Sequence, residues 1–266
     1  MHQTVRIGRL ADGELHAALA DARIQTLYQP IVRMSDRRPV GLEVLARLHH
    51  PLLGTLEPDH FVPGMELAGL GRPLFEAVIR SAFADWHDAG LAEFGLTLAV
   101  NLPLDVLLLP ETPDWLDAAR AASGIAARSI VIELTESQEI ACLATLTRAA
   151  AVLHDRGYVL AIDDVGPDVR DHSTLLDLPF TVLKLDRSLV QATQNDGAAL
   201  DFFTTTLEAA RRAGMIVIAE GVEDDSTWTS MAEHGIDLAQ GYIVSRPLPA
   251  TAVGPWLADW RRGTAA

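Results

Sequence analysis

The sequence contains one cysteine, Cys142, among 266 residues. This excludes a disulfide within the chain, a zinc ribbon and a CxxC redox pair. The sequence also lacks a run of 18 apolar residues, because Asn101 and Asp105 interrupt the longest candidate at 96–109. The N-terminus has no apolar stretch of signal-peptide length. From these absences we expect a cytoplasmic protein with no membrane segment in this chain.

Basic residues are scarce relative to acidic ones. The chain has 21 Lys and Arg against 36 Asp and Glu, which gives a formal net charge of −15. Proteins that bind a DNA or RNA polymer normally present a basic face, so the composition disfavours a nucleic-acid polymer as a partner. A ligand that carries phosphate would have to be bound by a cation within its own site, such as a metal ion or a single Arg or Lys.

Several well-known catalytic motifs are missing. The chain has no HExxH, GxSxG or GxxxxGK sequence. None of its nine histidines falls at the end of an expected strand. These absences disfavour a zinc protease and an HD-type phosphohydrolase.

Short β-type runs alternate with longer helical runs along the chain. After a lead-in helix within residues 1–20, eight strands alternating with helices favour a closed (β/α)8 barrel. The length suits one domain of that fold, so we expect residues 1–266 to form a single barrel domain. About seven residues separate the first two strands, too few for a helical crossover, so these strands should be antiparallel. We expect strands at 24–32, 40–48, 96–101, 130–134, 159–162, 181–185, 216–219 and 238–243.

Oxygen-bearing side chains end most of these strands. Carboxylates are costly to bury unless they are paired or bind metal, and active sites of barrels lie where the carboxyl ends of the strands converge. A single acid after a strand is usually a helix cap or a turn residue. Oxygen ligands at five strand ends and within a sixth strand favour a shared site instead. These residues are Glu43, Asn101, Glu133, Asp163, Asp164, Asp186 and Glu220.

A ring of carboxylates repels itself, and cations would relieve the repulsion. Because only oxygen donors are offered, Mg²⁺ or Mn²⁺ is favoured, with Ca²⁺ as a non-productive occupant. Lys184 lies two residues before Asp186 on one strand, so both should face the barrel interior. The lysine either neutralises the acids, or it positions or deprotonates a water or stabilises phosphoryl charge. Together these residues suggest two-metal hydrolysis of a phosphodiester.

The succession of short motifs resembles the EAL domains of bacteria, which are cyclic di-GMP phosphodiesterases. The Glu-Ala-Leu that names them stands here as Glu43-Val44-Leu45. The resemblance covers roughly residues 20–250 and preserves the order and spacing of the family's motifs. The matching segments are 28–32, 41–47, 50–54, 61–66, 100–101, 133–137, 163–164, 183–186, 219–223, 240–242 and 246–248.

The resemblance implies a modified barrel with one antiparallel strand, and hydrolysis of cyclic di-GMP to linear pGpG. It implies dependence on two ions of Mg²⁺ or Mn²⁺, inhibition by Ca²⁺, and a homodimer formed through the barrel. One metal ion would be held by Glu43, Asn101, Glu133 and Asp163. Asp163 would bridge to a second ion, with Asp164, Asp186 and Glu220 nearby.

The resemblance also implies roles for single residues in catalysis and ligand binding. Lys184 would activate the water or stabilise charge, and it would act in the reaction together with Glu43, Asp164 and Glu220. Contacts with the ligand would come from Gln29, Leu45, Arg47, Asp186 and Gln240. Arg47 would meet a phosphate through its planar donor fork. Supporting positions would be filled by Glu136, Glu223 and Gln240, with Glu136 anchoring the loop that follows Asp163-Asp164.

That loop departs from the family pattern. The family usually continues Phe-Gly-Thr-Gly-Tyr-Ser-Ser-Leu, whereas residues 165–172 are Val-Gly-Pro-Asp-Val-Arg-Asp-His. In the family the loop orders the second metal site and contacts the dimer partner. Two hypotheses follow. The retained ligand set favours an active phosphodiesterase, and the altered loop favours a catalytically weak or inactive cyclic di-GMP receptor or scaffold that uses the same pocket.

Overall fold

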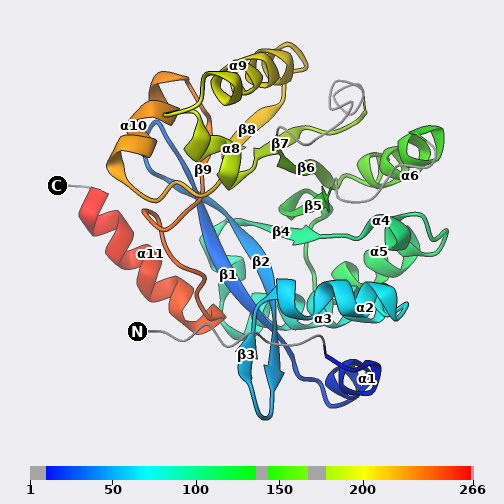
Figure 1. Cartoon of the computed structure of the whole chain (residues 1–266). Helices are drawn as coiled ribbons and strands as arrows, with labels where there is room; N and C mark the ends of the chain where they lie inside the picture. Colours follow the sequence, from blue (N-terminus) through cyan, green and yellow to red (C-terminus); the bar gives the residue numbers. More distant parts are fainter. Residues whose placement is uncertain (1–9, 136–142, 167–177, 265–266) are drawn as a thin grey trace.

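The computed structural model describes residues 10–135, 143–166 and 178–264. In this part of the chain the strands form a central barrel and the helices lie around it (Figure 1). The strands are β1 (Ile24–Arg33), β2 (Pro39–His50), β3 (Gly54–Leu56), β4 (Thr97–Asn101), β5 (Ile130–Thr135), β6 (Val159–Val165), β7 (Val182–Leu185), β8 (Ile216–Ala219) and β9 (Leu238–Ala239).

The helices precede, connect and follow the strands of the barrel. Before the barrel stands α1 (Asp12–Ala20), and the C-terminal part of the described chain is α11 (Ala250–Thr264). The others are α2 (Val62–Leu67), α3 (Gly71–Asp88), α4 (Leu104–Leu107), α5 (Thr112–Ala122), α6 (Leu143–Asp155), α8 (Arg187–Ala192), α9 (Gly197–Arg212) and α10 (Asp225–Glu233). Among the described residues, none of the helices combines the length and apolar character that crossing a bilayer requires.

The sheet closes into an eight-strand barrel through its first strand. Its order is β1-β9-β8-β7-β6-β5-β4-β2-β3, and β1 also pairs with β2. β1 is antiparallel to both neighbours, whereas the pairs from β2–β4 round to β8–β9 are parallel. The antiparallel start expected from the short first connection is therefore confirmed.

Two details of the strands differ from the sequence expectation. β3 was not expected, and it extends β2 as a short hairpin outside the closed barrel. The last strand ends at Ala239 instead of continuing to 243. There the chain turns against the loop after β8, and a Cβ on Gly241 would lie 2.1 Å from the carbonyl oxygen of Val222. Of the residues expected to continue the strand, Gln240 and Gly241 are buried in this turn, whereas Tyr242 is exposed.

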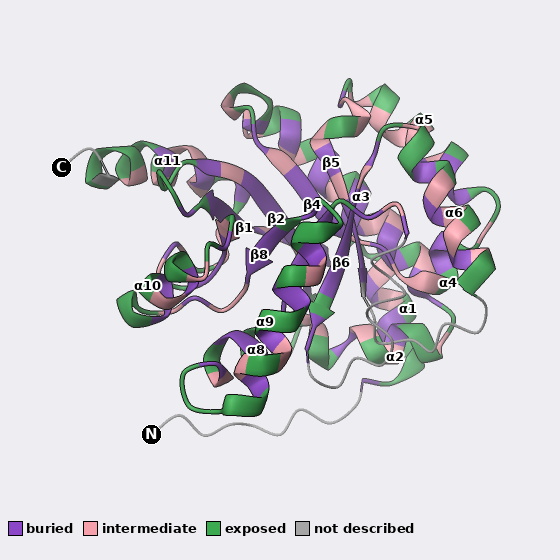
Figure 2. Cartoon of the chain, turned by 90° about the horizontal axis from the view of Figure 1, so that it is seen from above, coloured by how far each residue is buried: buried purple, intermediate pink, exposed green. Residues whose placement is uncertain are grey.

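Burial separates the barrel from its surroundings (Figure 2). The strands are mostly buried, while the helices alternate buried and exposed faces, as expected for amphipathic helices packed on a barrel. A small cluster of apolar side chains from the strands is separate from the main core between sheet and helices. Its buried members are Ile31, Ala161, Val182 and Ile218, and Val40, Val131, Val159 and Leu238 pack against them.

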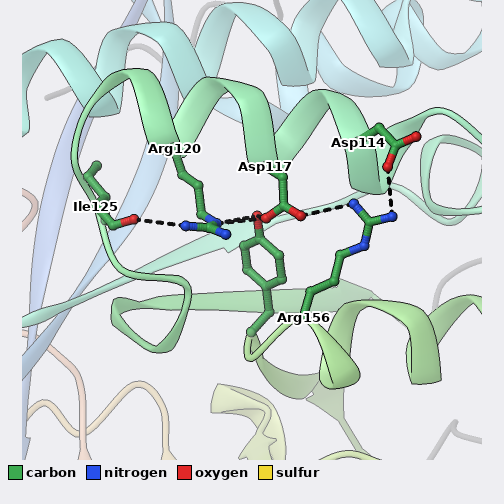
Figure 3. Close-up of polar contacts among 6 residues, drawn as sticks. Asp114, Asp117, Arg120, Ile125 and Arg156 are labelled. Carbon is green, nitrogen blue, oxygen red and sulfur yellow. Dashed lines mark hydrogen bonds and ion pairs between the residues drawn. The ribbon is translucent and has the colours of Figure 1, made fainter.

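A polar network on the outside of the barrel ties α5 to the start of β6 (Figure 3). Asp117 accepts hydrogen bonds from the Tyr158 hydroxyl at 2.9 Å, Arg120 Nε at 2.7 Å and Arg156 Nη1 at 2.9 Å. Arg156 Nη2 also bonds Asp114 at 2.7 Å. Burial would raise the pKa of Asp117, but these three donors outweigh it and lower the pKa. The network anchors the residues that precede β6, the strand that carries two acids of the site.

Candidate active site

The barrel interior changes from apolar to charged within two residues along several strands. Side chains two apart on a strand face the same side. On β5, β6, β7 and β8, an apolar residue that faces the barrel interior is therefore followed, two residues later and on the same face, by a charged residue nearer the carboxyl end. The four successions are Val131 to Glu133, Ala161 to Asp163, Val182 to Lys184 and Ile218 to Glu220.

Lys184 is the centre of this charged layer, and its side chain is 1% exposed. Its Nζ lies 2.7 Å from Glu220 Oε1, 2.8 Å from Asp163 Oδ1 and 3.0 Å from Glu133 Oε1. Glu43 Oε1 lies further away, at 3.7 Å. One ammonium thus faces three carboxylates from strands and a fourth from Glu220, the residue that follows β8, so the acids outnumber the cation.

Electrostatics within the layer favour a charged lysine. Burial lowers the pKa of Lys184, but attraction to Asp163, Glu133, Glu220 and Glu43 outweighs it, and the pKa is raised well above its usual value. A lysine that keeps its proton donates hydrogen bonds and stabilises negative charge, and it is not a base in this state.

Three carboxyls of the site, those of Glu133, Asp164 and Glu220, are pushed toward their neutral forms. Burial, followed by repulsion from neighbouring acids, raises the pKa of Glu220 to about 8 and the pKa of Asp164 to about 6. The pKa of Glu133 is raised well above its usual value, mainly by burial. Lys184 opposes all three shifts. Without a further cation, this group of acids is under electrostatic strain.

Asp163 and Asp164 reach the same site although they are consecutive. In a regular strand their side chains would point to opposite faces. The pairing of β6 with β7 shifts register between Ile162 and Val165, and Asp164 has a φ of +56°. A bulge with one residue in the left-handed region turns a side chain that would otherwise point away. Both aspartates consequently line the same cavity.

Glu43 is positioned by the amide side chains of Gln240 and Asn101, and Gln29 in turn contacts Gln240. Gln240 Nε2 donates to Glu43 Oε2 and also to Gln29 Oε1, the latter at 3.1 Å. Gln29 lies directly opposite Glu43 in the β1–β2 pair, and its own Nε2 donates to the Ser245 carbonyl at 3.1 Å. Asn101 Nδ2 donates to Glu43 Oε1 at 3.4 Å. These contacts hold the carboxylate at the base of the cavity.

The residues fit a hard divalent cation. Oxygen atoms of Glu43, Glu133 and Asp163 lie within 4.8 Å of one another, as do oxygens of Asp163, Asp164 and Glu220. Asp163 belongs to both groups, so it could bridge two ions. Glu133 Oε2 is buried and has no hydrogen-bond partner in the described chain. An orphaned carboxylate oxygen is costly, and an oxygen-preferring cation would satisfy it.

A cavity of about 630 Å³ opens above this layer. Its base carries acids and amides, including Glu43, Asn101, Asp163, Asp164 and Glu220. One wall is apolar and formed by α2 and α3. Residues of this wall are Val62, Leu74, Phe75 and Val78. The volume is that of an ordinary small-molecule site. Leu45, Gln29, Gln240 and Glu223, all predicted from the sequence, also line the cavity.

Two other predicted residues, Asp186 and Arg47, are not among those that line the cavity. β7 ends at Leu185, and Asp186 instead caps α8 by accepting from the Ser188 amide at 2.8 Å. Arg47 is buried and its Nη1 donates to the Ala46 carbonyl at 2.8 Å. Glu136 lies outside the described residues. The metal and ligand roles implied for these residues by the resemblance stay predictions.

Sequence reasoning missed two features of the cavity. The apolar wall comes from helices that carry no chemical motif. Arg187, which directly follows Asp186, also lines the cavity. Its signal in the sequence is modest: it is a cation beside a strand end in a chain poor in cations.

We expect the metal-free protein to lose stability as pH rises from about 5 to about 8.5. The pKa values of Asp164 and Glu220, about 6 and about 8, lie above the ordinary 3.8 and 4.5. The folded state therefore binds these protons more tightly than the unfolded chain. Their stabilising contribution is complete below the ordinary values and is lost as pH passes about 6 and then about 8. Melting temperatures in a chelator measure this.

Two controls accompany the pH series. In Glu220→Gln, the melting temperature should fall less at the alkaline end of the pH series, because the substituted side chain does not titrate. Mg²⁺ should raise the melting temperature more at the alkaline end, because ions bind deprotonated carboxylates. A wild-type profile that runs parallel to that of Glu220→Gln would contradict the assignment of this loss to Glu220.

Comparisons with known proteins agree with this geometry. The chain matches the family described as EAL domain over residues 12–247. It is 31% identical to the cyclic di-GMP phosphodiesterase NbdA and 30% identical to the cyclic di-GMP phosphodiesterase RocR, both of Pseudomonas aeruginosa. These alignments cover 93% and 87% of this chain but 32% and 59% of those proteins. The chain therefore spans only part of the length of these relatives.

Solved structures of similar fold include the PaMucR phosphodiesterase in complex with c-di-GMP. It superposes with a TM-score of 0.82 at 26% identity, over 90% of this chain and 97% of that one. The FimX EAL domain of Pseudomonas aeruginosa bound to c-di-GMP has a TM-score of 0.78 at 24% identity, with the same two coverages. Both show the barrel described above.

Proposed function

This chain belongs to the EAL domain family, and we propose that it is a metal-dependent phosphodiesterase that hydrolyses cyclic di-GMP to the linear dinucleotide pGpG. The observation that carries the proposal is the buried Lys184 among four carboxylates at the base of a ligand-sized cavity. Such a layer has an excess of negative charge that a purely structural ion pair does not need. It suits a site that takes up cations.

The oxygen-only donor set favours Mg²⁺ or Mn²⁺. One ion would be held by Glu43, Asn101, Glu133 and Asp163, and a second by Asp163, Asp164 and Glu220. Such ions polarise a phosphodiester and lower the pKa of a water. Ca²⁺ prefers more ligands at longer distances, so we expect it to occupy the site without supporting turnover.

The chain's own residues then have separable roles in hydrolysis. A water oxygen bonds to phosphorus, the bond from phosphorus to the ribose 3′ oxygen breaks, and that oxygen takes up a proton. The Lys184 ammonium orients the water and stabilises negative charge on the phosphoryl oxygens. The proton leaving the water passes to Asp164 or Glu220 in this proposal, which is supported by the fact that both carboxyls line the cavity. Gln240 and Asn101 hold Glu43 in position, and Gln29 accepts a hydrogen bond from Gln240.

Turnover of cyclic di-GMP by the purified chain is the direct test. With Mg²⁺ or Mn²⁺ the product pGpG should accumulate, and a chelator or Ca²⁺ should stop it. Chromatography of the nucleotides measures both. Absence of product at saturating metal, with tight binding of cyclic di-GMP, would favour the receptor. Absence of both binding and turnover would overturn the proposal.

The altered sequence at 165–172 favours the second candidate, a cyclic di-GMP receptor or scaffold that uses the same cavity. Val165 ends β6, and its carbonyl accepts from the Asp186 amide at 3.0 Å. Residues 167–172 lie outside the described part of the chain. The retained acids and Lys184 support the enzyme, because a receptor needs no complete set of metal ligands.

Grafting the family's usual Phe-Gly-Thr-Gly-Tyr-Ser-Ser-Leu onto positions 165–172 tests the loop. If the native loop fails to order the second metal ion, the graft should raise kcat and lower the Mg²⁺ concentration that gives half-maximal rate. The native loop contains Pro167, which restricts one φ angle, and two acids, Asp168 and Asp171, which follow Asp164 by four and seven residues in the sequence. Equal rates and equal metal dependence in the two proteins would show that the loop has drifted without consequence.

The homodimer and the cytoplasmic location expected from the sequence stay predictions. Light scattering coupled to size-exclusion chromatography, with and without cyclic di-GMP, measures the first.

A further inference from the structure

Arg187 has an unusual place in the cavity. Seven acidic residues line it: Glu43, Asp59, Glu66, Asp163, Asp164, Glu220 and Glu223. Of the described residues that line the cavity, Arg187 is the sole lysine or arginine. Neither Lys184 nor Arg47 is among the residues that line the cavity. A dianionic ligand that enters this cavity therefore meets one exposed cationic side chain.

Two contacts fix the position of the Arg187 side chain. Its Nη2 lies 2.9 Å from Glu223 Oε1, and the side chain remains 54% exposed. Its stem packs on Gly221, where a Cβ would lie 2.1 Å from Arg187 Cγ and 2.6 Å from Arg187 Cβ. Gly221 has a φ of +62° and directly follows Glu220, which contacts Lys184. The guanidinium is thus held at a fixed place beside the charged layer.

The ion pair engages one nitrogen of a group that has five N–H donors. A guanidinium is always charged, and its planar fork matches the oxygens of a phosphodiester. An exposed ion pair between an arginine and a single acid contributes little to the free energy of unfolding. Facing a cavity lined by acids, the same side chain offsets the repulsion that the ligand would otherwise meet.

We propose that Arg187 binds a phosphodiester oxygen of the nucleotide, and that Glu223 and Gly221 position its guanidinium. This inference rests on the proposed function, because it takes cyclic di-GMP as the ligand. The inference adds a phosphate contact from Arg187 and leaves the contact implied for Arg47 by the resemblance as a prediction. Arg187 acts in binding, and the reacting atoms remain with Lys184 and the acids.

The test compares Arg187→Gln and Arg187→Lys with the wild type. Kd for cyclic di-GMP is measured by calorimetry with Ca²⁺, and KM and kcat are measured with Mg²⁺. Arg187→Gln should raise Kd and KM by on the order of 10- to 100-fold, the effect of losing a hydrogen bond to a charged group. The kcat should stay within about threefold, because an interaction made equally in ground and transition states changes KM. For Arg187→Lys, Kd and KM should lie between those of the wild type and those of Arg187→Gln.

The dependence of Kd on salt concentration distinguishes a contact of Arg187 with a phosphate from a contact with a guanine base of the ligand. Kd of the wild type should rise more steeply with ionic strength than Kd of Arg187→Gln, because screening weakens an exposed charge pair. If Kd of the wild type and Kd of Arg187→Gln rise equally with ionic strength, the phosphodiester contact is overturned and a contact with a guanine base is favoured. Arg212→Gln is the matched control, since Arg212 pairs with Glu208 on α9 and is 71% exposed. It should leave Kd, KM and kcat unchanged.

The outcomes distinguish this inference from the proposed function. Normal turnover by the wild type with an unchanged Kd in Arg187→Gln overturns the role of Arg187 and leaves the phosphodiesterase intact. A wild type that neither binds nor hydrolyses cyclic di-GMP overturns both. Melting temperatures of the variants check that each has folded.

Discussion

Asp163→Asn should abolish metal-dependent hydrolysis of cyclic di-GMP without destabilising the metal-free fold. Asp163 is shared by the two groups of oxygen donors, so the change removes a ligand from both. We expect kcat to fall on the order of 1000-fold or more, because metal charge stabilisation contributes several kcal/mol to such reactions. The asparagine keeps the shape of the side chain and removes one negative charge.

The stability of this variant follows from the charge balance around Lys184. Asp163 Oδ1 is one of four carboxylate contacts of the ammonium, and those with Glu133, Glu220 and Glu43 remain. Removing one acid from a group under mutual repulsion should leave the melting temperature in chelator equal or higher. Glu43→Ala should likewise abolish hydrolysis. A drop in the melting temperature of Asp163→Asn in chelator would contradict the repulsion argument. Unchanged turnover in Asp163→Asn would contradict the two-metal proposal.

Strand positions could be predicted from the sequence because the apolar runs of a barrel are short, buried and regularly spaced. The interior positions of Glu133, Lys184 and Glu220 follow from the period of two in a strand. That rule fails where the backbone departs from it. It would place Asp163 and Asp164 on opposite faces, and the bulge with the positive φ at Asp164 brings both to the cavity.

Residues at strand ends were harder to predict than residues within strands. Asp186 follows β7 and caps a helix, which is the ordinary role of an acid at that position. Whether such an acid faces the site or caps the next helix depends on a shift of one residue in where the strand ends. The sequence carries no signal for that shift. Arg187 was missed for a related reason, since its place depends on the room left by Gly221 in a separate loop. Such contacts arise from tertiary packing.

Lys184→Met should separate the reactive role of this lysine from its role as a counter-charge. Methionine has a similar length and no charge, so four buried carboxylates would lose their cation. Breaking a buried ion pair on one side costs about 3–5 kcal/mol. The melting temperature in chelator should therefore fall at neutral pH, and it should recover as pH falls and the carboxyls become neutral. Saturating Mg²⁺ should also restore it, because the ions replace the missing charge.

Activity of the Mg²⁺-loaded variant decides between the two roles. If Lys184 orients the water and stabilises phosphoryl charge, kcat should remain at least about 100-fold below the wild type even where the melting temperature is restored. Kd for cyclic di-GMP should change little, because Lys184 is not among the residues that line the cavity. A purely structural counter-charge predicts the opposite result, near-normal kcat per folded molecule once Mg²⁺ is bound. Melting curves and turnover measured on one preparation distinguish the two, because only the reactive role leaves a folded, metal-loaded and ligand-binding protein that does not hydrolyse.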